Sequence, residues 1–202
     1  MTPSITALAT SLFALVLSTA VASAAEPGPR VVDEGGVRDR WMLAEGSTLA
    51  SPALPRAATQ GARNVCIALG YTIAPDGKTS DFRVLKHWNS QSGDATEPFD
   101  GFWLDYARAG TAAVEAWRFA PRPGVAAPVA TTTVATLTWQ AQPGTDAIAL
   151  RARCRIDGLA AFLERTRRES LTNRQVDSDN RMRERALRKQ AGTPKNKPTI
   201  RQ

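Results

Sequence analysis

Residues 65–73 alternate strictly between large and small side chains, and this run constrains the fold more than any other part of the chain. The successive side chains of a strand point to opposite faces, so such a run predicts a strand with one face in a core. The large members are Val65, Ile67, Leu69, Tyr71 and Ile73.

A turn signal follows this strand in the sequence PDGK, which contains Asp76 and Gly77. Asp-Gly is among the strongest hairpin signals, because Gly adopts a positive φ at little cost. Beyond the turn, Phe82 and Val84 alternate with charged residues up to about Trp88. We therefore expect a β-hairpin whose second strand is half exposed.

After residue 100 the apolar residues recur every third or fourth position instead of every second. This spacing predicts a helix with one apolar face. Two prolines, Pro121 and Pro123, prevent its continuation, so the helix should end near residues 117–118. The residues expected on the apolar face are Phe102, Tyr106, Ala109, Ala113 and Trp117.

Residues 129–139 are rich in Val and Thr and predict a third strand. The elements then read β-β-α-β, and a right-handed crossover makes the outer strands parallel with the first strand between them. The expected fold is α+β: a three-stranded antiparallel/mixed sheet of order 2-1-3 with the helix packed on one face. The third strand would be an edge, open to an extended segment of another chain unless residues after Gln140 or a second copy cover it.

The head of the chain contains the apolar run ALATSLFALVLSTAVASAA, with small residues at Ala22 and Ala24. This pattern is typical of a secretory signal peptide cut after Ala24, and the alternative is an uncleaved anchor. We expect a periplasmic protein, or in the second case one anchored in the inner membrane and facing the periplasm. Only the uncleaved form would contact a membrane through this segment.

The chain has two cysteines, Cys66 and Cys154. An oxidising compartment favours a disulfide between them, although two separate buried thiols are the alternative. No C-x-x-C motif occurs, so the cysteines do not predict a zinc or redox site.

The positive charge is concentrated at the C-terminal end. From Arg151 onward there are 15 Lys and Arg against 6 Asp and Glu, whereas the whole chain has 26 against 19. We expect the domain at 51–140, a flexible segment at 25–50, a linker with a short amphipathic helix at 141–172, and a basic disordered tail at 173–202. The tail could bind envelope polyanions or simply be solvated. Nucleic acid is not expected for an exported chain without a basic–aromatic groove pattern.

Catalytic motifs are missing from the sequence. The single histidine, His87, follows a strand pattern, and there is no G-x-S-x-G, H-E-x-x-H or phosphate-binding glycine loop. We therefore expect no enzyme activity, cofactor or metal. Among the tryptophans, Trp117 and Trp139 fit core positions, whereas Trp103 falls off the apolar helix face and is the candidate exposed aromatic.

Residues 54–139 resemble the C-terminal domain of TonB-type energy transducers. The resemblance lies in a proline–x–x–alanine start, the Asp-Gly hairpin, a helix ending in W-R-F-x-P and a final strand. Its motif residues here are Pro55, Asp76, Gly77, Trp117, Arg118, Phe119 and Pro121.

In this family the final strand binds a short peptide of an outer-membrane receptor by edge-strand addition. The resemblance therefore implies a protein partner and a link to energy-dependent transport across the outer membrane. The candidate partner-binding residues are Val129, Thr131, Thr133, Ala135, Leu137 and Trp139. The alternative function is a soluble periplasmic interaction module without energy transduction, dimeric or attached to envelope polyanions through its basic tail.

Overall fold

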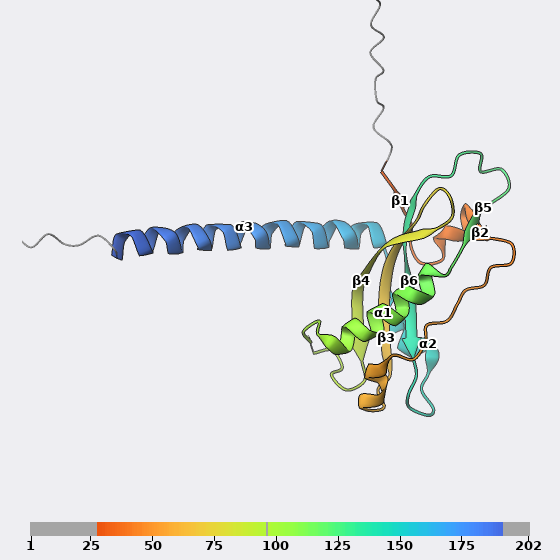
Figure 1. Ribbon diagram of the computed structural model, residues 1–202, viewed down its shortest axis with the longest axis horizontal. Helices are drawn as coiled ribbons and strands as arrows, with labels where there is room; N and C mark the ends of the chain where they lie inside the picture. The colour runs from red at the N-terminus through yellow and green to blue at the C-terminus, as the bar shows by residue number, and fades with distance from the viewer. Residues whose placement is uncertain (1–27, 96, 192–202) are drawn as a thin grey trace, which may run out of the picture.

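The computed structural model describes the backbone of residues 28–95 and 97–191, and the side chains up to residue 185. The predicted signal peptide, residues 1–24, lies outside this part of the chain. The main sheet has the strand order β1-β6-β3-β4 (Figure 1). Its strands are β1 (Arg30–Val31), β6 (Thr131–Trp139), β3 (Val65–Ile73) and β4 (Thr79–Asn89).

The predicted hairpin is confirmed: β3 pairs antiparallel with β4 across the Asp76-Gly77 turn, and on its other side β3 pairs antiparallel with β6. The expectation of only three strands is wrong, because β1 adds to β6 in parallel. Its hydrogen bonds run from the Arg30 N–H to the Ala130 C=O and from the Val32 N–H to the Thr132 C=O. A strand of two residues has no alternation to read, so the sequence pattern could not reveal it.

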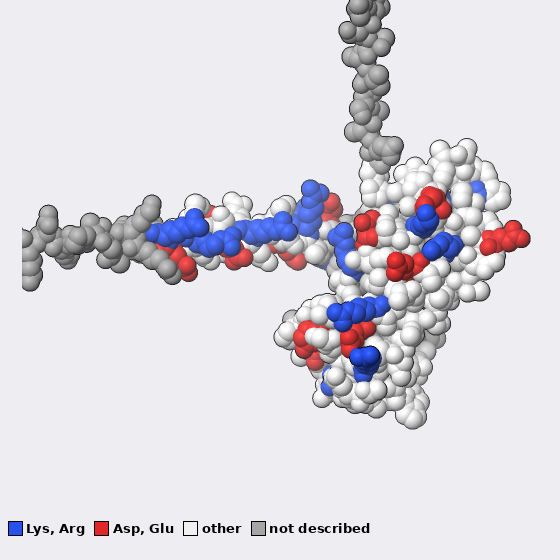
Figure 2. Space-filling model, in the orientation of Figure 1, with Lys and Arg blue, Asp and Glu red and all other residues white. Residues whose placement is uncertain are grey.

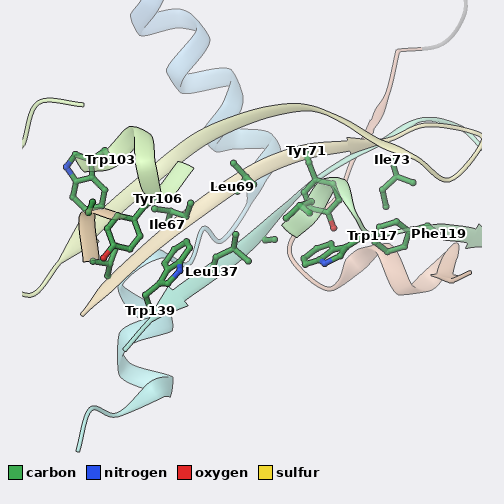
Figure 3. Packing of buried hydrophobic residues seen from close by; sticks show 14 of the residues in the cluster. Ile67, Leu69, Tyr71, Ile73, Trp103, Tyr106, Trp117, Phe119, Leu137 and Trp139 are labelled. Atoms are coloured by element: carbon green, nitrogen blue, oxygen red, sulfur yellow. The ribbon is translucent and has the colours of Figure 1, made fainter. Parts of the chain in front are cut away.

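Helix α1 (Gly101–Glu115) packs on one face of the sheet, and the Asp100 carboxylate accepts a hydrogen bond from the Phe102 N–H at its start. After α1, β5 (Phe119–Pro121) pairs antiparallel with β2 (Trp41–Leu43) in a separate two-stranded sheet. Figure 3 shows aromatic side chains from α1, β6 and the segment after α1 filling the space over β3.

The buried face of α1 is rotated from the predicted one. Trp103, expected to be exposed, is only 2 % exposed, and its Nε1–H donates to the Glu97 carboxylate at 3.0 Å. The reason is Gly110, where an added Cβ would lie 2.8 Å from Leu137 Cδ1. The helix therefore approaches the sheet along the line through Gly110, which turns Trp103 inward and leaves Phe102 half-buried.

The opposite face of the sheet is also covered, by α2 (Ala147–Cys154) and the first turns of α3 (Leu159–Ala191). The prediction that only one face of β3 is buried is therefore wrong: all nine of its residues are buried. Cys66 of β3 and Cys154 of α2 form a disulfide with a Cα–Cα distance of 5.9 Å, and both residues are fully buried.

Helix α3 projects away from the sheet (Figure 1). Residues 173–191, which we expected to be disordered, continue this helix, and residues 192–202 lie outside the described part. The Asp33 carboxylate accepts hydrogen bonds from the Gly158 and Leu159 N–H groups and so caps the helix start. Beyond Glu164 the described side chains are exposed, so local helix propensity rather than packing supports this part of α3.

The segment before β3, expected to be flexible at residues 25–50, contains β1, β2 and the 3₁₀ helix η1 (Gly36–Asp39). A second 3₁₀ helix, η2 (Arg56–Gln60), begins directly after Pro55. Ordered segments on both sides of the expected 51–140 domain thus contribute to the same cores.

Candidate functional site

The predicted partner-binding strand, β6, pairs with β3 along one edge. Its other edge, which faces away from β3, is the candidate binding site. Strand β1 pairs with the first two residues of β6, Thr131 and Thr132, and then the chain leaves the sheet. From Thr133 to Trp139, no further strand lies beside this edge within the described residues. Among the outward residues of this stretch Val134 and Thr136 are only 2 % and 3 % exposed, whereas Thr138 is half-buried, so the accessible part of the edge is the end near Thr138.

The residues that present backbone groups at this edge are the even-numbered ones. In a strand the N–H and C=O of one residue point to the same side, and the side alternates along the chain. Ala130 and Thr132 accept from β1, and the Thr136 N–H is bonded outward to Glu34. By alternation, Val134 and Thr138 also point outward, and among the described residues no hydrogen-bond partner lies on their outer side.

The predicted contact residues of the strand occupy the opposite positions. Val129 precedes β6, and the other five have their backbone groups on the β3 side. Their side chains are buried, with Ala135, Leu137 and Trp139 in the core under α1. A one-residue difference in strand register exchanges the two sides, so the sequence could locate the strand and not its outward groups.

A groove of about 520 Å³ runs along this edge. One wall is β6 from Val134 to Thr138, and the other is the segment around Leu49–Pro52 and Val37. Trp117 and Phe119 contribute the apolar floor. The groove thus offers apolar surface beside backbone groups that lack a strand partner, the combination that strand addition requires.

Two motif residues of the predicted helix end, Trp117 and Phe119, line this groove, and Arg118 and Pro121 lie beside them in the chain. Trp117 donates from Nε1 to the Ala50 C=O at 3.0 Å and meets Tyr71 edge-on at a ring distance of 5.9 Å. Arg118 donates to the C=O groups of Glu115 and Trp117 and thereby closes the end of α1. Pro121 lies at the end of β5, opposite Trp41.

The hairpin turn docks on the same segment. The Phe119 N–H donates to the Gly77 C=O at 3.0 Å, and an added Cβ at Gly77 would lie 1.8 Å from the Phe119 oxygen. Gly77 has a φ of +80°, a conformation that glycine adopts readily. The Asp76 carboxylate accepts from the Lys78 N–H, and this hydrogen bond, with the Lys78 side chain, lowers the pKa of Asp76.

An ion pair between Glu34 and Arg151 sits on the middle of the open edge. The Glu34 carboxylate accepts hydrogen bonds from both the N–H and the Oγ1 of Thr136, each at 2.8 Å. Arg151, from α2, donates to the Thr136 C=O at 2.9 Å. Sequence reasoning missed both residues, because Glu34 lies 102 positions from Thr136 and no local pattern connects them.

Two ionisable side chains, Tyr71 beside the groove and His87 on β4, have pKa values that burial shifts. Burial raises the pKa of Tyr71 above its ordinary value, and the charge of Glu34 raises it further. His87 lies against Trp103 with a ring distance of 4.3 Å, and its partial burial lowers its pKa. In residues 28–95 and 97–191 there is no group of three His, Cys, Asp or Glu side chains suited to hold a metal ion.

A second hollow of about 530 Å³ lies on the other side of the molecule, between the end of β4 and α2. Trp88 and Arg153 line it, with the guanidinium 5.2 Å from the indole ring. Arg153 also pairs with Asp94 at 3.5 Å, with both side chains more than half exposed. It lies away from the edge of β6, and its polar lining contains no feature that selects a ligand.

Helix α3 presents a row of basic side chains. Arg167, Arg174, Arg181 and Arg185 are spaced by seven, seven and four residues. At 3.6 residues per turn these spacings keep the four side chains on one side of the helix, and Figure 2 shows basic side chains in a band along it. None of the helices among the described residues is both long and apolar enough to span a membrane.

Comparisons with known proteins show a weak likeness to a solved structure. No protein-family model and no curated protein matches the chain. A solution NMR structure of the TonB CTD of Pseudomonas aeruginosa is similar to 52 % of this chain and to 89 % of its own, with 21 % identity and a TM-score of 0.36. With a TM-score of 0.36, this likeness shows nothing about what the chain binds or does.

Proposed function

We propose that this protein is a non-enzymatic interaction module that binds an extended segment of a partner protein along the outer edge of β6. The observation that carries the proposal is the open second half of this strand. There the outward backbone groups of Val134 and Thr138 adjoin the groove, and Thr138 is half-buried rather than fully buried. Strand addition satisfies such groups through main-chain hydrogen bonds, while the groove would hold alternate side chains of the partner.

The test begins with twelve-residue peptides selected from a random display library on the immobilised protein. Their affinity is then measured by calorimetry for the wild type, Thr138→Pro and the matched control Thr138→Ala. Proline removes the outward N–H of a half-buried residue, and loss of its hydrogen bond together with the ring's steric conflict should weaken binding about tenfold or more. Thr138→Ala should bind within about twofold of the wild type, since its backbone is unchanged.

Equal affinity for Thr138→Pro and Thr138→Ala would contradict edge addition. Thr133→Pro is a poorer test, because the Thr133 backbone faces β3 and its loss would damage the sheet. A peptide containing an N-methyl group at alternate positions supplies the reciprocal control on the ligand. In a homodimer, the β6 edges of two copies would pair in the same way. Analytical sedimentation tests this by comparing the oligomeric state of the wild type with that of Thr138→Pro.

A role in energy-dependent transport across the outer membrane is the finer form of the proposal, and it rests on the resemblance of residues 54–139 to TonB-type domains. A photo-crosslinking amino acid in place of Leu49, which lines the groove and is 54 % exposed, would identify the partner in cells. Recovery of an outer-membrane receptor, lost with Thr138→Pro, would support the transport role. Recovery of only soluble envelope proteins would favour an interaction module without energy transduction.

Attachment to an anionic envelope surface is the second candidate function, and the exposed arginine row on α3 favours it. Each Arg near an anionic surface contributes about 1 kcal/mol, so replacing all four by Gln should weaken vesicle binding strongly. The measurement is sedimentation with phosphatidylglycerol vesicles at low and high salt, with the four-Lys variant as control. Binding that is insensitive to salt and to the Gln replacements would exclude this role.

The periplasmic location is part of the proposal as well. It depends on the predicted cleavage after Ala24, which the intact mass of the protein recovered from cells would test. A mass beginning at Ala25 means release into the periplasm, and a mass that retains residues 1–24 means that the apolar segment stays on the chain as an anchor.

A further inference from the structure

The Glu34–Arg151 ion pair occupies the two backbone groups at the centre of the open edge. An incoming antiparallel strand pairs with an edge residue through one C=O that accepts and one N–H that donates. At Thr136 the Glu34 carboxylate takes the place of that C=O, and the Arg151 guanidinium takes the place of that N–H. The chain therefore provides its own substitute for a ligand residue at this position.

The donors around Glu34 form a site for a carboxylate. The Thr136 N–H, the Thr136 hydroxyl and the Arg151 guanidinium converge on its two oxygens. Charge-assisted hydrogen bonds of this kind are the stronger class and are directional. The Glu34 side chain is 20 % exposed and the Arg151 side chain 53 % exposed, so the site lies at the groove wall within reach of solvent.

Glu34 is held on a short connection between β1 and η1. Next to it, Gly35 has a φ of +85°, and Asp33 is fixed to the start of α3. Arg151 by contrast lies on α2, which the Cys66–Cys154 disulfide ties to β3. Glu34, which accepts the hydrogen bonds, thus lies on an irregular segment. Arg151, which donates, lies on a helix that the disulfide fixes to the sheet.

We infer that Thr136 and Arg151 form a carboxylate-binding subsite for the partner's segment, and that Glu34 occupies it until a carboxylate of the partner displaces it. This inference rests on the proposed function and adds the chemistry of the partner: an extended segment with an acidic side chain or a free C-terminus at the position opposite Thr136. Occupation by Glu34 is intramolecular, with an effective concentration on the order of millimolar or higher, so it excludes stray anions and weak ligands.

The first test uses sodium acetate as the probe and the Thr136 amide signal in NMR as the readout, at constant ionic strength. Glu34→Ala vacates the subsite, and the double variant Glu34→Ala/Arg151→Gln removes its cation. We expect a saturable shift of the Thr136 amide in Glu34→Ala that is at least about fivefold smaller in the wild type and in the double variant. No saturable shift in Glu34→Ala, or an equal shift in the double variant, would overturn the inference. Glu34→Ser, whose short side chain also leaves the subsite empty, replaces Glu34→Ala if that variant unfolds.

The second test separates the two sources of carboxylate. Three hexapeptides of alternating Thr and Val are compared on Glu34→Ala: one blocked at both ends with a central Glu, one blocked with Gln instead, and one with no acidic side chain and a free C-terminus. A preference of about tenfold for the Glu peptide over Gln indicates an acidic side chain, and a similar preference for the free C-terminus indicates that group. Equal binding of all three overturns the subsite.

The outcomes also separate this inference from the proposed function. Acetate needs no strand pairing, so an acetate response without any peptide binding would retain the subsite and contradict edge addition. Equal binding of the Glu and Gln peptides, lost in Thr138→Pro, would retain edge addition and contradict the subsite. With both correct, the wild type should bind the preferred peptide several-fold more weakly than Glu34→Ala.

Discussion

Replacing Gly77 by Ala tests whether the hairpin turn and the W-R-F segment form one packed unit. Two effects act at this position. A non-glycine residue at positive φ costs about 1–2 kcal/mol, and the φ of Gly77 is +80°. The second effect is contact, because the added Cβ would lie 1.8 Å from the Phe119 oxygen and 2.8 Å from its carbonyl carbon.

The backbone must therefore separate, and the hydrogen bond from the Phe119 N–H to the Gly77 C=O breaks. Loss of that bond adds about 0.5–1.5 kcal/mol, and Phe119, which is only 8 % exposed, shifts in the core. We expect a total decrease in the free energy of unfolding of about 2–4 kcal/mol. The assay is urea unfolding followed by tryptophan fluorescence with the disulfide intact.

Gly124→Ala is the matched control. Its φ is +91° and no atom lies within 4 Å of an added Cβ, so it carries the backbone cost alone. The difference between the two variants isolates the contact with Phe119. If Gly77→Ala and Gly124→Ala destabilise the protein equally, within about 0.5 kcal/mol, the docking of the turn on this segment contributes nothing and the reasoning fails.

Three further predictions concern the disulfide, the buried tyrosines and Trp103. Replacing both Cys66 and Cys154 by Ser should lower the free energy of unfolding by roughly 4–5 kcal/mol, since the bridge closes a sequence separation of 88 residues; a loss below about 1 kcal/mol in urea unfolding would contradict this. Burial raises the pKa of both Tyr71 and Tyr106, the two tyrosines of the chain. The unfolded chain then loses these protons first, near pH 10, so stability should fall as the pH rises above about 10; tyrosinate absorbance should appear at higher pH in the native protein than in urea, and coincident titrations would refute it. Trp103→Ala should cost about 3–5 kcal/mol of unfolding free energy, whereas Leu104→Ala on the exposed side of α1 should cost less than about 1 kcal/mol; equal losses in the same assay would mean that the buried face of the helix is misassigned.

Local patterns were sufficient for the elements around the hairpin. Alternation from Val65 to Ile73, the Asp-Gly turn and the prolines after Trp117 each act over a few residues, and β3, β4 and the end of α1 follow them. The disulfide could also be predicted from the sequence, because two cysteines allow only one pairing. These features depend on steric limits and on periodicity, which are properties of neighbouring residues.

The buried face of α1 could not be predicted from local patterns. Gly110 was a weak point of the helix by propensity, yet it is where α1 approaches Leu137 and Ile67 most closely. Periodicity put Phe102 inside and Trp103 outside, and the two faces differ by one residue. The contact that decides between them comes from β3 and β6, far along the chain.

The tail shows a similar limit. Residues 173–191 have few apolar side chains, so their composition indicated disorder, but they continue a helix that begins in the core at Leu159 and is capped by Asp33 from the opposite end of the chain. A helix that is already nucleated extends at little cost through residues with good helix propensity, which include Arg, Glu and Leu.

Local sequence patterns predict the hairpin, the helix and its end, the third strand and the cysteine pair, because each of these depends on interactions between near neighbours or on a single possible pairing. Contacts that form only in the folded chain set which side of β6 is open, place β1 beside its beginning and bring Glu34 and Arg151 to its centre. These contacts join residues about a hundred positions apart, and a one-residue change of register would replace every one of them.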